Sequence, residues 1–125
     1  MSQVHHPTYR VRVEQVISGD DILCLVELAI DDLYKKVRCR LDGVDTPDGY
    51  RQERSTAAGE VRNEVRKMLK GQQCSIKLIS ASRKDWKVIF YIHKGDEMFN
   101  LNEYLQSKGY VYQQDSKDAK AKAVS

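Results

Sequence analysis

The sequence predicts an α+β fold, a five-stranded OB-fold β-barrel with two or three helices. The chain has 125 residues, enough for one hydrophobic core and one domain. Five segments have the alternation or the β-branched composition of short strands, and a segment with helical spacing separates the third strand from the fourth. The resulting order, β-β-β-α-β-β-α, is that of an OB-fold barrel. Such barrels commonly bind nucleic acids or oligosaccharides, although the fold alone does not select a function.

The composition is that of an ordinary globular protein. Hydrophobic residues make up 41% of the chain and charged residues 31%, and no apolar run approaches the roughly 20 residues of a membrane-spanning helix. Residues 1–10 lack the apolar core of a secretory signal. We therefore expect an intracellular, cytoplasmic monomer without a membrane partner. The net charge of +3 is compatible with a polyanionic partner but by itself predicts none.

The chain is divided into three expected parts. Residues 1–7 are expected to form a flexible N-terminus, and residues 8–113 are expected to form the barrel domain. Residues 114–125 are expected to be disordered or weakly helical, because they contain one sizeable hydrophobe, Val124.

The three cysteines are predicted to have no chemical role. Their number is odd and they show no CxxC or CxxH spacing, which argues against a disulfide framework and against a zinc site. We interpret Cys24, Cys39 and Cys74 as buried thiols.

The first part of the chain contains three predicted strands. Apolar and polar residues alternate from Thr8 to Ser18, as in a strand with one buried face. Glycine and aspartate at 18–21 predict a turn, and the apolar run from Ile22 to Ala29 predicts the second strand. Alternation resumes from Tyr34 to Val44. Pro47 stops this third strand, because proline has no N–H group for a ladder hydrogen bond.

A helix is predicted to follow the third strand. It begins at Ser55, which suits an N-cap, and Gly71 follows it as a C-cap. Its basic residues are Arg62, Arg66, Lys67 and Lys70. We interpret this basic face first as solvated surface and second as a phosphate-binding face.

The last part of the chain predicts two more strands and a short helix. The strands are Cys74–Ala81 and Lys87–His93, joined by the polar hairpin Ser82–Trp86. A turn is predicted over Lys94–Glu97. The helix is predicted over Asn100–Lys108, where Gly109 ends it.

Two of the turns resemble those of a known family. The segment 40–48, RLDGVDTPD, lies downstream of the segment 16–21, VISGDD. The former resembles the arginine and V-D-T-P-E turn of the staphylococcal nuclease family, and the latter resembles that family's V-I-D-G-D-T turn. The following helix, the strand at 90–92 and the segment 100–112 correspond as well, so the resemblance covers residues 13–112.

The resemblance implies a staphylococcal-nuclease-like (SNase-like) barrel that hydrolyses phosphodiester bonds of DNA or RNA with bound Ca²⁺. It assigns the Ca²⁺ to the carboxylates of Asp20 and Asp45 and to the backbone carbonyl of Thr46. Hard oxygen ligands suit Ca²⁺, and so few carboxylates imply a dissociation constant of about 10⁻⁴ to 10⁻³ M. The resemblance also assigns phosphate contact to Arg40, since charge that spreads over phosphoryl oxygens needs a positioned cation.

Two expected catalytic positions depart from the family's pattern. The glutamate that orients the attacking water or accepts its proton corresponds to Asp48, which is one methylene shorter. A displacement of about 1 Å at a reacting group costs roughly 10²-fold in rate. The second phosphate-binding arginine corresponds to Lys87, which keeps the charge but loses the bidentate fork. We therefore expect reduced activity from the catalytic set Arg40, Asp48 and Lys87.

Further positions complete the expected site. The family has an aspartate where Ser18 stands and a threonine where Asp21 stands. Asp21 either adds negative charge near the metal or points into solvent. Nucleic-acid contacts are expected from basic and aromatic side chains, namely Arg83, Lys84, Trp86 and Tyr112.

Two other functions remain open. An OB-type relative that has lost catalysis would bind single-stranded nucleic acid through lysines and aromatic side chains, and the changes at Asp48 and Lys87 favour this alternative. A barrel that binds a protein partner is the third hypothesis, and the modest net charge favours it.

Overall fold

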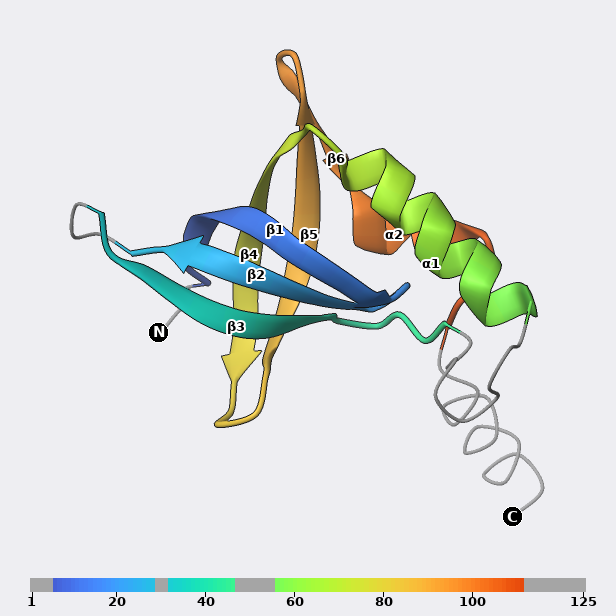
Figure 1. Cartoon of the computed structure of the whole chain (residues 1–125), viewed down its shortest axis with the longest axis horizontal. Coiled ribbons are helices and arrows are strands. Elements are labelled where there is room, and N and C mark those ends of the chain that lie inside the picture. The colour runs from blue at the N-terminus through green and yellow to red at the C-terminus, as the bar shows by residue number, and fades with distance from the viewer. Residues whose placement is uncertain (1–5, 29–31, 47–55, 112–125) are drawn as a thin grey trace, which may run out of the picture.

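The structure is a computed structural model that describes residues 6–28, 32–46 and 56–111. The elements in chain order are β1 (Thr8–Ser18), β2 (Asp21–Glu27), β3 (Tyr34–Leu41), α1 (Thr56–Leu69), β4 (Gln73–Ala81), β5 (Trp86–Lys94), β6 (Glu97–Asn100) and α2 (Leu101–Ser107). The sheet order is β3-β2-β1-β4-β5-β6, and parallel pairing of β3 with β5 closes the first five strands into a barrel (Figure 1). The predicted α+β OB-fold barrel is confirmed.

Strand β1 belongs to two strand pairs. Residues 8–11 pair with β4, and residues 11–18 pair with β2. A register shift between Val13 and Gln15 marks a β-bulge, which bends a strand and increases its twist. The predicted bounds of this strand, Thr8–Ser18, are confirmed. Its length and bend allow one strand to pass from one side of the barrel to the other.

The strand predictions need three corrections. Strand β6 was not predicted, because its four residues are partly exposed and its existence depends on pairing with β5 across a two-residue turn at Gly95. Strand β3 ends at Leu41 and not at Val44, since Gly43 adopts a φ of +77° in a turn. Trp86 is the first residue of β5 and not part of the hairpin loop.

Helix α1 lies against one end of the barrel (Figure 1). Its residues Val61, Val65 and Leu69 are buried in the core. Gly71 has a φ of +73°, which confirms its predicted position as the C-cap. The four basic residues named above are exposed, which confirms the solvated face, and their contact with phosphate stays a prediction.

A buried amide helps to hold helix α2 against the barrel, beside the buried Leu101 and Leu105. Oδ1 of Asn102 accepts a hydrogen bond from the backbone N–H of Phe90 at 2.8 Å. Its Nδ2 donates to the carbonyl oxygens of Asp42 at 2.9 Å and Val88 at 3.0 Å. Asn102 therefore connects α2, β5 and the turn after β3. The prediction began this helix at Asn100, which instead caps it by accepting from the N–H of Glu103.

All three cysteines are free and buried. A hydrogen bond with Cys39 and burial raise the pKa of Cys24 far above its ordinary value. Burial raises the pKa of Cys74 to about 11. The interpretation of these residues as buried thiols is confirmed.

Some expectations fall on other parts of the chain. The N-cap Ser55, residues 1–5 and the tail 114–125 lie outside the described residues. Within the described residues, no helix has the length and apolar character needed to cross a membrane.

Candidate active site

Two turns that are far apart in the sequence meet at one end of the barrel. Gly19 and Asp20 lie between β1 and β2, and Thr46 follows β3. A Cβ atom on Gly19 would lie 2.8 Å from Cγ2 of Thr46 and 3.0 Å from Cγ2 of Val61 on α1. Because real Cβ atoms do not approach so closely, the packing of this turn against Thr46 and the helix requires glycine. Asp20 and Thr46, both expected at the metal site, are thus neighbours.

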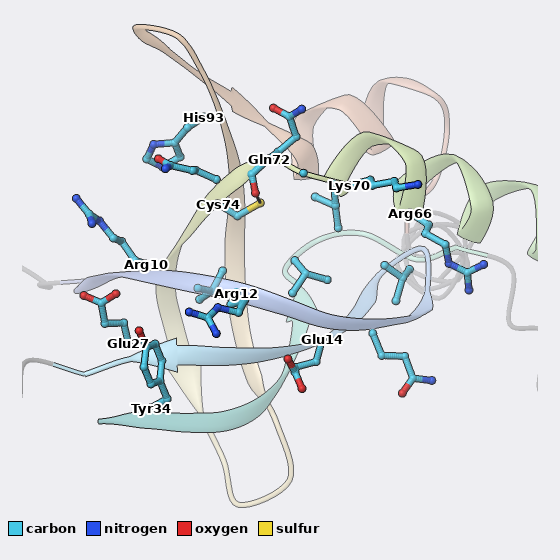
Figure 2. Close-up of a pocket in the computed structure, with 17 residues that line it drawn as sticks. Arg10, Arg12, Glu14, Glu27, Tyr34, Arg66, Lys70, Gln72, Cys74 and His93 are labelled. Carbon is cyan, nitrogen blue, oxygen red and sulfur yellow. Dashed lines mark hydrogen bonds between the residues drawn. The ribbon is translucent and has the colours of Figure 1, made fainter. Parts of the chain in front are cut away.

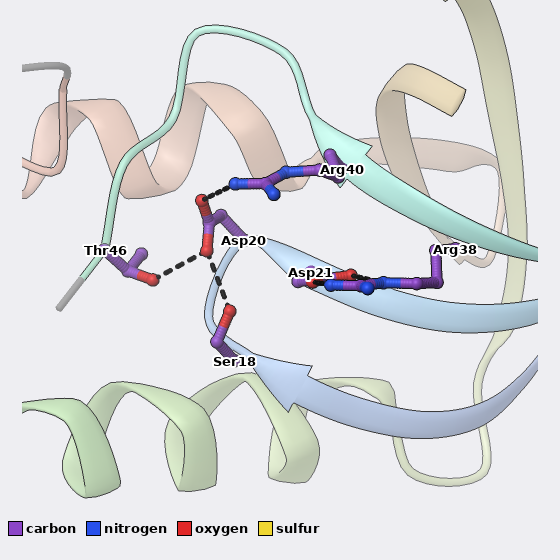
Figure 3. Close-up of polar contacts among 6 residues, drawn as sticks. All are labelled: Ser18, Asp20, Asp21, Arg38, Arg40 and Thr46. Carbon is purple, nitrogen blue, oxygen red and sulfur yellow. Dashed lines mark hydrogen bonds and ion pairs between the residues drawn. The ribbon is translucent and has the colours of Figure 1, made fainter. Parts of the chain in front are cut away.

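The carboxylate of Asp20 is the centre of this region (Figure 3). Its Oδ1 accepts hydrogen bonds from Oγ of Ser18 at 2.8 Å and from Oγ1 of Thr46 at 3.0 Å. Nη2 of Arg40 lies 3.8 Å from the other oxygen, Oδ2. The residue is 6% exposed. One buried carboxylate therefore joins the end of β1, the end of β3 and the loop that follows β3.

The charge of Asp20 is only partly compensated. Burial raises the pKa of this carboxyl above its ordinary value, because the ionised form loses contact with water. The hydrogen bonds from Ser18 and Thr46 and the charge of Arg40 lower the pKa, but they do not cancel the effect of burial. A further positive charge beside Oδ2 would stabilise the ionised form.

Asp21 has a separate partner. It forms an ion pair with Arg38, whose Nη2 and Nε face the carboxylate (Figure 3). Of the two alternatives for Asp21, exposure to solvent is wrong, since the residue is 4% exposed, and added negative charge near a metal stays a prediction. The hydrogen bond and the charge of Asp21 raise the pKa of Arg38. Sequence reasoning missed Arg38, although its two-residue spacing from Arg40 places both side chains on one face of β3.

Arg40 and Lys87 lie side by side. They are partners in the parallel pairing of β3 with β5, and Arg40 is also paired with Asp21 of β2. Their neighbours Leu41 and Val88 are buried, so the two cations lie on the outer face of the barrel. The Arg40 side chain is 41% exposed, and Lys87 is exposed. The structure thus brings together the two residues expected to contact phosphate.

The hairpin between β4 and β5 carries the other expected nucleic-acid contacts. Arg83 and Lys84 are exposed at its tip. Oγ of Ser82 accepts hydrogen bonds from the backbone N–H groups of Lys84 and Asp85, both at 3.2 Å, which shape this turn. Trp86 is half-buried, and its ring centroid lies 5.7 Å from that of Tyr9, so part of its surface is used in packing.

The remaining expected residues are less defined. The side chain of Asp45 is half-buried, and its backbone N–H donates to the carbonyl oxygen of Tyr110 at 3.1 Å. Asp48 and Tyr112 lie outside the described residues. Over residues 6–28, 32–46 and 56–111, no three His, Cys, Asp or Glu side chains form a group that could hold a metal ion. The set expected here has two carboxylates, Asp20 and Asp45.

Comparison with known proteins adds no family to these observations. A scan of protein-family models and a search of curated proteins both find no match to this chain. The resemblance to staphylococcal nucleases accordingly rests on the two turns and the elements that correspond with them.

Proposed function

We propose that this protein is a Ca²⁺-dependent nuclease that hydrolyses phosphodiester bonds of DNA or RNA at reduced rate. The observation that carries the proposal is the meeting of the two turns, which puts the Asp20 carboxylate beside Thr46 and Arg40. The resemblance assigns a cation to Asp20 and phosphate contact to Arg40, and a bound cation and a guanidinium both stabilise the charge that develops on phosphoryl oxygens.

The residues present fit a weak calcium site. Asp20 and Asp45 would supply carboxylate oxygens and Thr46 its carbonyl oxygen, all hard ligands of the kind that Ca²⁺ prefers. The geometry of Asp20 supports this assignment, because Nη2 of Arg40 lies 3.8 Å from Oδ2, which is too far for a hydrogen bond to that oxygen. When bound, the ion would withdraw charge from a phosphoryl oxygen.

The protein's own cations would hold the phosphate. Arg40 reaches Asp20 with one nitrogen at 3.8 Å while much of its side chain stays accessible to a ligand. Lys87, its neighbour on β5, adds a second positive charge without a bidentate fork. From the resemblance, Asp48 is proposed to hold the attacking water or accept its proton.

The experiment is a gel assay of single-stranded DNA and RNA with Ca²⁺, Mg²⁺ or EDTA. We expect cleavage in millimolar Ca²⁺, none in EDTA, and a loss of at least about 10²-fold in Asp20→Asn. Asp96→Asn, a change at an exposed turn residue, is the matched control and is expected to cleave at the normal rate. Cleavage by Asp20→Asn at the control rate would reject the assignment.

Calcium binding has a readout that does not depend on cleavage. A site with a dissociation constant of about 1 mM would stabilise the folded protein by about 1.4 kcal/mol in 10 mM Ca²⁺. The melting temperature should therefore rise by about 5 °C in the unaltered protein and should not rise in Asp20→Asn. Equal shifts in both proteins would place the ion elsewhere.

A second candidate is a module that binds nucleic acid without cleaving it. The observation that favours it is that Asp20 already has Ser18, Thr46 and Arg40 as partners, while Lys87 and the hairpin cations stay exposed. This candidate predicts salt-sensitive binding of a labelled single strand, unchanged by EDTA and by Asp20→Asn, with no cleavage product.

A further inference from the structure

A second region of interest is a groove between β1 and the C-terminal end of α1 (Figure 2). The groove has a volume of about 720 Å³ and also borders the start of β4. Asp20, Arg40 and Lys87 are not among the residues that line it. It is therefore separate from the candidate active site.

The groove borders the main-chain edge of β1. Every residue from Arg10 to Val16 lines it, although successive side chains of a strand point to opposite faces. A cavity that touches both faces must run along the edge between them. The pairing of β1 with β4 ends at Val11 and Cys74, whereas its pairing with β2 continues to Ser18. Beyond Val11, this edge of β1 has no partner strand within the described part of the chain.

The side chains around this edge combine an apolar floor with excess positive charge. The floor contains the half-buried Val11 and Val13 and the buried Leu69. The cationic side chains are Arg10 and Arg12 of β1, Arg66 of α1 and Lys70 of the turn after α1, against the acidic Glu14 and Glu27 (Figure 2).

Two of these four cations, Arg10 and Lys70, are available to a ligand, whereas the other two contact neighbouring side chains. Arg12 lies over the ring of Tyr34, with its Cζ 5.4 Å from the centroid, and Arg66 donates to Asn63. Arg10 and Lys70 form no ion pair with a carboxylate of the described residues. Arg10 lies on β1 and Lys70 in the turn after α1, at two separate places on the border of the groove, so a ligand with more than one negative charge suits it better than a single small anion.

We propose that this groove binds an extended acidic peptide segment of a partner protein, which adds a strand to the open edge of β1. Main-chain hydrogen bonds to such an edge provide affinity, and alternate side chains provide specificity. Acidic side chains of the peptide contact Arg10 and Lys70, and apolar side chains cover the floor. The bulge between Val13 and Gln15 keeps the paired stretch short, so the charged contacts contribute much of the affinity. This inference goes beyond the nuclease proposal and does not depend on it.

The test is a titration of the ¹⁵N-labelled full chain with a capped hexapeptide that alternates glutamate with valine, followed by NMR. We expect chemical-shift changes that are largest over residues 12–16 and at Lys70, with saturation below about 1 mM. A peptide with lysine in place of glutamate is expected not to bind. A peptide with every backbone nitrogen methylated is expected to bind at least about tenfold more weakly, because it lacks donors for the strand edge.

Variants of the protein separate the groove from other basic surface. The double variant Arg10→Gln and Lys70→Gln is expected to bind the glutamate peptide at least about tenfold more weakly. Arg62→Gln removes an exposed cation of α1 that does not line the groove, and it is the matched control with unchanged affinity. The peptide is expected to leave nucleic-acid cleavage unchanged, so either proposal can fail alone.

Three results would overturn the proposal. One is the absence of shift changes at millimolar peptide, and another is equal binding by the double variant and the control. The third is equal binding of the methylated peptide, which would make the groove a site for compact organic anions and not for an added strand.

Discussion

Strand β1 borders two regions that differ in whether their polar side chains have partners within the protein. Where the strand ends, the buried Asp20 accepts hydrogen bonds from Ser18 and Thr46 and lies 3.8 Å from Arg40. Along the groove, exposed cations such as Arg10 and Lys70 border an open strand edge without an ion-pair partner among the described residues. In the first region the polar groups bind one another, whereas in the second region two cations and a strand edge have no such partners among the described residues.

The difference indicates where substitutions will cost stability. Buried donors and acceptors that bind one another leave unpaired partners when one is removed, and an unpaired buried polar group lowers the free energy of unfolding. Exposed charges without partners contribute little to folding, so their removal is expected to affect binding alone. We call the surroundings of Asp20, together with the turn after β3, the turn region. Substitutions in the turn region should therefore change stability, and substitutions in the groove should change affinity.

The largest effect is expected when the support of the turn region is removed. Asn102→Ala leaves the N–H of Phe90 and the carbonyl oxygens of Asp42 and Val88 without their side-chain partner. We expect the free energy of unfolding to fall by about 3 kcal/mol and the melting temperature by more than about 10 °C. Urea denaturation and calorimetry measure both.

The matched control for Asn102 is Gln106→Ala on the same helix. Gln106 is exposed and donates to the carbonyl oxygen of Gly43 at 3.0 Å. Its removal should cost no more than about 0.5 kcal/mol. Similar losses for both variants would show that the buried amide has no special part in holding the turn after β3.

A smaller effect is expected at the contact between the two turns. A methyl group at Gly19 must displace Thr46 or Val61, which costs about 2 kcal/mol and weakens the hydrogen bond from Thr46 to Asp20. Gly19→Ala should therefore lower both the melting temperature and any cleavage rate.

Gly59→Ala is expected to raise stability, in contrast to Gly19→Ala. Gly59 lies inside α1, and a Cβ atom there would meet nothing within 4 Å. Alanine should stabilise the helix by about 0.8 kcal/mol. If both glycine variants changed stability in the same direction, the close packing of the turns would not be the cause.

A third effect concerns the buried charge and depends on pH. Burial raises the pKa of Asp20 in the folded protein above the ordinary value of 3.8. The folded state therefore holds this proton more tightly than the unfolded state, and stability falls as pH rises from the unfolded pKa through the folded pKa. Above the pKa of the folded protein, the ionised carboxylate opposes folding.

Asp20→Asn removes this charge and keeps an oxygen for Ser18 and Thr46. We expect the melting temperature to rise by about 3 °C at pH 7, and the gain to vanish at pH 3, where both states bind the proton. Asp96→Asn, at an exposed turn, should leave stability unchanged at both pH values. A lower melting temperature of Asp20→Asn at pH 7 would mean that Arg40 and the hydroxyl groups outweigh burial.

The smallest effect on stability is expected in the groove. Arg10→Gln and Lys70→Gln remove exposed cations, so each should change the free energy of unfolding by less than about 0.5 kcal/mol. Chemical denaturation of each variant tests this. A loss of more than 1 kcal/mol from either would show that these charges belong to the fold, and the contrast with the turn region would disappear.

Much of the architecture was predictable because its signal is local. The alternation over residues 8–18 predicted β1 with its observed bounds, and the helical spacing after residue 55 predicted α1. Strand β6 escaped prediction, since partly exposed residues such as Met98 form a strand only when β5 is beside them. An element whose stability comes from its neighbour leaves little trace in its own residues.

The candidate site was predictable only in part. The resemblance pointed to Asp20, Thr46 and Arg40, which the fold brings together. Asp20 and Thr46 are 26 residues apart in the sequence. It did not reveal that Ser18 donates to Asp20 or that Arg38 pairs with Asp21. The resemblance also did not reveal that Asn102 connects α2 to β5 and to the turn after β3. An asparagine on a buried helix face needs partners from other elements, and the sequence does not identify them.

The order of strands and helices follows from residues that are close in the chain, because the spacing of apolar side chains is a local property of the backbone. Three features arise only when the barrel closes: the burial of Asp20, the position of Arg40 beside it, and the open edge of β1. Each of them depends on contacts between distant segments, and no local pattern of residues encodes such contacts.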